Sequence, residues 1–113
     1  MTQLYLTIKK VWLDQILSGK KKKEYRDIKP GLQSRYLQLD KDGYCIKKNG
    51  EFLPREYDQI LFKCGEQRVI VEVLGAKVNI LRDNKGKVIF HEKGNDRFYA
   101  AQVVYDLGKI LQR

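Results

Sequence analysis

Short apolar segments that alternate with polar residues run through most of the chain, and this pattern limits the fold more than any other feature. Alternation with a period of two residues is typical of strands that bury one face. Helical spacing is clear only over residues 9–18, where Trp12, Leu13, Ile16 and Leu17 recur. The pattern therefore predicts one clear helix among strands at residues 4–8, 57–64, 68–81, 88–91 and 97–105.

The connections between these segments are short and carry glycine. Asn49-Gly50 is a two-residue hairpin signal inside a polar stretch, residues 40–55, which we interpret as a hairpin insertion. Short connections leave no room for crossovers between parallel strands. We therefore expect a single α+β domain over residues 1–113. It would be a small, curled, mostly antiparallel β-barrel with one N-terminal helix packed on it and a second short helix or turn around Arg35.

Several kinds of protein are disfavoured by the composition. No stretch approaches the roughly 18 apolar residues of a membrane span, and residues 1–8 are too short and polar for a signal peptide, so we expect a cytoplasmic protein without membrane contact. Cys45 and Cys64 lack the spacing of paired metal ligands, and His91 is the only histidine. We expect reduced thiols, no metal and no cofactor.

The charge of the chain is unusual and unevenly distributed. The 23 basic and 14 acidic residues give a net charge of +9, which favours a polyanionic partner. Eight basic residues but only three acidic ones lie between Lys9 and Lys29. Any anion is therefore expected to bind near this part of the chain.

The centre of that basic region is Gly-Lys-Lys-Lys-Lys-Glu-Tyr-Arg, residues 19–26. Gly19 suits the position just past a helix, where a left-handed backbone favours glycine. In the strand that follows, alternation puts Glu24 and Arg26 on one face and Tyr25 on the other, toward the core. Lys21 is out of phase, so it reaches the same face only if residues 20–22 are irregular.

Residues 19–26 match the G-x-K-x-x-E-x-R signature of the ASCH family at Gly19, Lys21, Glu24 and Arg26. The strand and helix of residues 4–17, the segment 57–62 and the closing residues 98–110 also look like ASCH domains. The resemblance implies a PUA-like fold, a barrel-like module found in RNA-binding proteins.

The first functional hypothesis is binding of single-stranded or modified RNA, or of a nucleotide. Lysines attract phosphates, arginine makes two-pronged contacts, and a carboxylate accepts hydrogen bonds from a base. Lys21, Glu24 and Arg26 would form the inner ring of the site. The expected outer contacts are Lys9, Lys10, Lys20, Lys22 and Arg35.

The second hypothesis is hydrolysis. One branch of the ASCH family resembles small amidohydrolases that remove an acyl group from a modified cytidine nucleoside. That branch uses the motif lysine, a second carboxylate elsewhere, and a threonine at the place of Glu24. Here Lys21 would act as a base, Glu24 would position or activate water, and Ser18 or Tyr25 would be a substitute hydroxyl.

A third interpretation is structural. A lysine run at a helix-to-strand corner is often a solvated surface, and Glu24 beside Arg26 would then be a same-face ion pair. Core packing is likewise the expected role of Trp12, Tyr25 and Phe62, ahead of stacking on bases.

Overall fold

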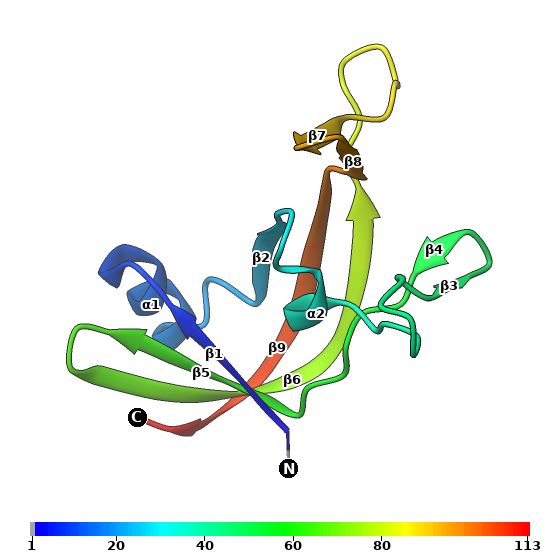
Figure 1. The fold of residues 1–113 in the computed structure, drawn as a ribbon. Coiled ribbons are helices and arrows are strands. Elements are labelled where there is room, and N and C mark those ends of the chain that lie inside the picture. The colour runs from blue at the N-terminus through cyan, green and yellow to red at the C-terminus, as the bar shows by residue number, and fades with distance from the viewer. Residues whose placement is uncertain (1) are drawn as a thin grey trace. The chain divides into compact units, whose positions relative to one another are not determined.

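The computed structural model describes residues 2–113, so expectations about Met1 lie outside it. The described residues form two helices and nine strands (Figure 1). In chain order they are β1 (Gln3–Thr7), α1 (Lys10–Leu17), β2 (Lys23–Ile28), α2 (Gln33–Tyr36), β3 (Lys47–Lys48), β4 (Glu51–Phe52), β5 (Gln59–Cys64), β6 (Gln67–Ile80), β7 (Phe90–Lys93), β8 (Asp96–Tyr99) and β9 (Ala101–Gln112).

Five strands form one sheet in the order β1-β5-β6-β9-β2, and the pairs β3-β4 and β7-β8 form two small sheets. The α+β class, the N-terminal helix and the short second helix around Arg35 are confirmed. Neither helix within residues 2–113 has the length and apolar character that crossing a membrane requires.

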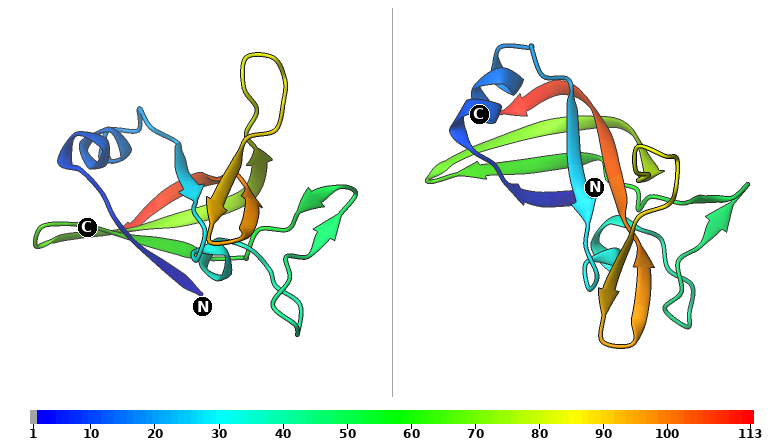
Figure 2. Two further views of the ribbon diagram at one scale, coloured as in Figure 1. Left: turned by 45° about the horizontal axis from the view of Figure 1, so that its top comes forward. Right: turned by 90° about the horizontal axis from the view of Figure 1, so that it is seen from above.

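One expectation about the sheet is wrong, because β1 pairs with β5 in parallel (Figure 2). The expectation rested on the short connections between strands that follow one another in the sequence. β1 and β5 do not follow one another, and the 51 residues from 8 to 58 that connect them are long enough for a parallel crossover. β5 and β6 pair antiparallel, as expected of a hairpin.

The chain divides into two compact units. The first runs up to Glu24, resumes over Glu56–Ala76 and ends with Tyr105–Arg113. Its core follows directly from the period-two pattern, since Leu4 lies opposite Ile60 and Leu6 opposite Phe62. All four side chains are buried, as are Val69 and Val71 of β6 and Leu13 and Ile16 of α1. The helix contacts β5, so the first unit buries α1 on the sheet.

The second unit comprises Tyr25–Arg55 and Lys77–Val104. The predicted hairpin is present as β3 and β4, and its turn residues Asn49 and Gly50 have φ values of 54° and 79°. Two left-handed residues in succession are what a tight two-residue hairpin requires. The prediction from Asn49-Gly50 is thus confirmed.

One strand boundary differs from expectation. β6 is a single strand, as predicted for residues 68–81. The last strand is divided between β8 and β9 at Ala100. The backbone N–H of Ala100 donates to Ile89 at 2.8 Å, and its carbonyl accepts from Leu81 at 2.8 Å. These two bonds hold the chain where the strand divides.

Replacement of Gly19 tests the corner after α1. Gly19 has φ +81°, and an added Cβ would meet no atom within 4 Å, so the cost of Gly19→Ala is conformational alone. We expect the free energy of unfolding to fall by about 1 kcal/mol, measured by urea denaturation. Gly75→Ala is the matched control, because its added Cβ makes an ordinary contact with Asp106 at 3.8 Å. An equal loss in both variants would contradict this account.

Candidate functional site

The chain turns from α1 into β2 through an irregular corner, as the position of Lys21 requires. The Gly19 N–H donates to the carbonyl of Ile16 at 3.1 Å, and the Lys21 N–H donates to the carbonyl of Gln15 at 3.0 Å. Both bonds fold the corner back onto the end of the helix. β2 begins only at Lys23. Lys21 precedes the strand, so the alternation of side chains in β2 does not determine where Lys21 points.

The corner brings Lys21 and Glu24 together. Lys21 Nζ lies 3.5 Å from Glu24 Oε1, and the two side chains are only 17% and 7% exposed. The same ammonium lies 5.7 Å from the centre of the Trp12 ring, at the distance of a cation–π contact. Two of the four motif residues therefore form an inward-facing ion pair in the first unit.

A pocket of about 630 Å³ opens beside this pair, between the end of α1 and strands β6 and β9. Its apolar wall includes Leu74, Leu107 and Ile110. Its polar side chains are those of Ser18, Lys21, Lys22, Glu72 and Lys109. Glu72 Oε1 accepts a hydrogen bond from the N–H of Lys109 at 3.2 Å. The pocket thus combines three lysines, a hydrogen-bonded carboxylate and a hydroxyl with an apolar wall.

Glu72 was missed by the sequence analysis. It stands in the valine-rich part of β6, where Val71 is buried and Glu72 is half-buried. A carboxylate inside an otherwise apolar strand is costly unless it has a partner. That contrast was visible in the sequence and is the signal that could have found Glu72.

The remaining predicted contacts are divided between the two units. Lys9, Lys10 and Lys20 are exposed, and Lys10 pairs with Asp14 at 3.4 Å. Arg26 and Arg35 belong to the second unit, where Arg26 is half-buried and Arg35 lies 5.7 Å from the ring of Tyr36. The structure brings Lys21 together with Glu24, and with Lys22 on one pocket.

The predicted alternation of side chains along β2 is correct, but the predicted assignment of its buried face is wrong. Glu24 and Ile28 are buried and Arg26 is half-buried, whereas Tyr25 is 48% exposed. β2 is the last strand of its sheet, and Lys21 gives Glu24 a partner of opposite charge. The polar face therefore points inward and leaves Tyr25 outside.

The expected core roles of the aromatic residues are confirmed only in part. Phe62 is completely buried. Trp12 is 46% exposed, because Leu13 and Ile16 supply the buried face of α1. The prediction of core packing is thus wrong for Trp12 and Tyr25, and the exposed indole of Trp12 lies beside Lys21.

No protein-family model matches the sequence. No curated protein and no solved structure matches it either. Within residues 2–113, no group of three or more His, Cys, Asp or Glu side chains is arranged to hold a metal ion.

Removing the ammonium of Lys21 tests the ion pair. We expect Lys21→Met to lower the free energy of unfolding by about 2 kcal/mol, because the Glu24 carboxylate would remain buried beside an apolar side chain. Lys20→Met is the matched control, since Lys20 is exposed and its replacement should change stability by less than about 0.5 kcal/mol. Urea denaturation at neutral pH measures both. Equal stabilities of the two variants would show that the pair does not support the corner.

Proposed function

We propose that this protein binds RNA, single-stranded or modified, or a nucleotide, in the pocket of the first unit. The observation that carries the proposal is the placement of Lys21 and Lys22 on a pocket that also has an apolar wall. Lysine ammonium groups attract phosphate oxygens, and an apolar wall accepts the flat face of a base. The Glu72 carboxylate on the same pocket would accept hydrogen bonds from amino or imino groups of a base.

Two further features support this proposal. Trp12 is 46% exposed and lies beside Lys21, so its ring can stack on a base outside the pocket. The resemblance of residues 19–26 to the ASCH motif also favours a nucleic-acid ligand, and with it a PUA-like barrel. In this proposal Lys9, Lys10 and Lys20 of the first unit are additional phosphate contacts.

The dependence of affinity on salt tests the proposal. With about five neutralised phosphates, the logarithm of the binding constant for a single-stranded oligonucleotide should fall against the logarithm of salt concentration with a slope near −3.5. Fluorescence anisotropy of labelled RNA measures the slope. Binding that is undetectable, or that does not change with salt, would rule the proposal out.

A pair of lysine variants locates the interface. Lys22→Gln removes a pocket cation and should reduce the slope by about 0.7 and weaken binding. Lys85→Gln removes an exposed charge from the turn of residues 83–86 in the second unit, and should leave both values unchanged. Equal losses would place the binding elsewhere on the chain.

Hydrolysis of an acylated nucleoside is the second candidate, favoured by the presence of Ser18, Lys21 and Glu72 on one pocket. Glu24 was the predicted catalytic carboxylate, but its side chain is 7% exposed and paired with Lys21. Glu72 is the carboxylate on the pocket wall, where it can accept a proton from an attacking water.

Incubation with a panel of acylated nucleosides tests this second candidate by chromatography of the products. The wild type should release the parent nucleoside, and Glu72→Gln should reduce the rate by at least about 100-fold. Glu66→Gln, in the β5–β6 turn, should leave the rate unchanged. A panel without turnover would eliminate hydrolysis and leave the binding proposal intact.

A further inference from the structure

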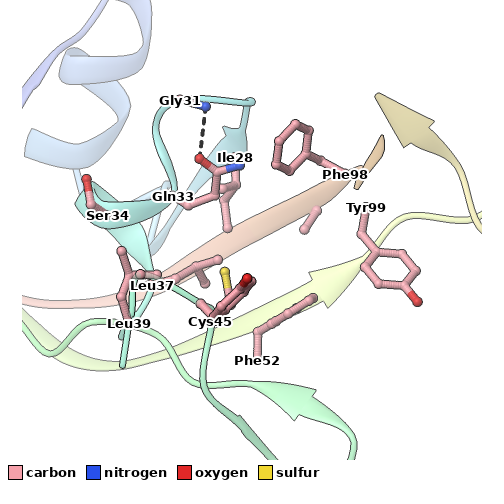
Figure 3. Close-up of a pocket in the computed structure, with 13 residues that line it drawn as sticks. Ile28, Gly31, Gln33, Ser34, Leu37, Leu39, Cys45, Phe52, Phe98 and Tyr99 are labelled. Carbon is pink, nitrogen blue, oxygen red and sulfur yellow. Dashed lines mark hydrogen bonds between the residues drawn. The ribbon is translucent and has the colours of Figure 1, made fainter. Parts of the chain in front are cut away.

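The second unit contains its own pocket, of about 430 Å³, made entirely of residues that the motif does not include. Figure 3 shows its apolar lining, to which Ile28, Leu37 and Leu39 contribute together with the rings of Phe52, Phe98 and Tyr99. Pockets of about 300–1,000 Å³ are typical of sites for small organic ligands. The size and lining therefore suit one small molecule.

The aromatic rings line one side of this pocket and extend beyond it. The rings of Phe52 and Tyr99 lie 6.0 Å apart and are tilted at 59°, and Phe90 stacks on Tyr99 at 5.2 Å. Tyr99 and Phe90 are 40% and 39% exposed. Aromatic faces prefer other aromatic rings in offset or edge-to-face arrangements, so the lining favours a planar ligand over an alkyl chain.

A cation lies at these rings. Lys47 Nζ is 4.8 Å from the centre of the Phe52 ring and 5.2 Å from that of Tyr99. Lys47 is exposed and lies opposite Phe52 in the β3–β4 hairpin. Two ring faces thus hold one ammonium beside the pocket, where an anionic group of a ligand can reach it.

The polar groups of the pocket itself are neutral. Gln33 Oε1 accepts the N–H of Gly31 at 2.9 Å, and Ser34 and Cys45 also line the space. Burial raises the pKa of the Cys45 thiol, an effect that Lys47 opposes and Asp40 reinforces. Asp40 Oδ1 accepts the N–H groups of Asp42 and Tyr44, at 2.9 and 3.0 Å. The Asp40 carboxylate therefore accepts hydrogen bonds within its own turn.

We propose that this pocket binds a small planar aromatic molecule that carries one carboxylate or phosphate group. The ring lies against Phe52, Phe98 and Tyr99, and the anionic group pairs with Lys47. A neutral, apolar interior beside a positioned cation selects both parts of such a ligand. The site is independent of the nucleic-acid interface proposed for the first unit.

Titration of the isotopically labelled protein with indole-3-acetate tests the site by nuclear magnetic resonance. We expect saturable shifts of the Gly31 and Gly43 amides, which border the pocket, with a dissociation constant below about 1 mM. The amides of Gly19 and Gly108, on the pocket of the first unit, should not move. Phenyl phosphate serves as the second probe and distinguishes a carboxylate from a phosphate ligand.

The role of Lys47 is tested with a neutral analogue and a neighbouring residue. Indole-3-acetamide should bind the wild type about fivefold more weakly than the acid does, and Lys47→Gln should abolish this difference. Lys48→Gln removes the next charge along β3 and should preserve it.

Three outcomes would overturn the proposal. The first is the absence of saturable shifts at Gly31 and Gly43 with both anions. The second is equal affinity for octanoate, which would show that the rings do not select an aromatic ligand. The third is an unchanged preference for the acid over the amide in Lys47→Gln. Loss of RNA binding in the first unit would leave each of these results unaffected.

Discussion

The ion pair between Lys21 and Glu24 is the constraint on which the corner after α1 depends. A carboxylate that is almost fully buried requires compensation by charge and hydrogen bonding. Lys21 provides the charge only because the corner is irregular, and the corner is irregular because Gly19 adopts a left-handed conformation. The glycine, lysine and glutamate of the motif thus have a shared structural reason for their spacing, which accompanies any role in binding.

Much of the fold was predictable because its signals are local. The alternation of Leu4 and Leu6, the helical spacing of Leu13 and Ile16, and the Asn49-Gly50 turn each specify a structure without distant partners. The parallel pairing of β1 with β5 was not predictable in this way. This pairing joins segments more than 50 residues apart. The only sign of it in the sequence is that each strand has apolar residues at alternate positions.

The candidate site was predictable in part, for the same reason. Glu24 and its alternation with Tyr25 could be identified, but the direction of the strand depends on what covers each face. Glu72 lies on the pocket because of the position of β6 in the sheet. Trp12 is exposed because Leu13 and Ile16 form the buried face of α1. The second pocket had no sequence signal, since its aromatic residues come from separate hairpins and look like ordinary strand positions.

The four consecutive lysines that dominate the sequence have four different environments. Lys21 faces Glu24, and Lys23 pairs with Asp106 at 2.5 Å, so two of the four charges have acidic partners. Lys20 is exposed, and Lys22 is exposed on the pocket. Attraction of a distant polyanion therefore rests more on Lys20 and Lys22 than on the motif lysine, because a charge compensated nearby contributes little to the field at long range. In the binding proposal, Lys21 would act at short range, where its position beside Glu24 would orient a ligand group already in the pocket.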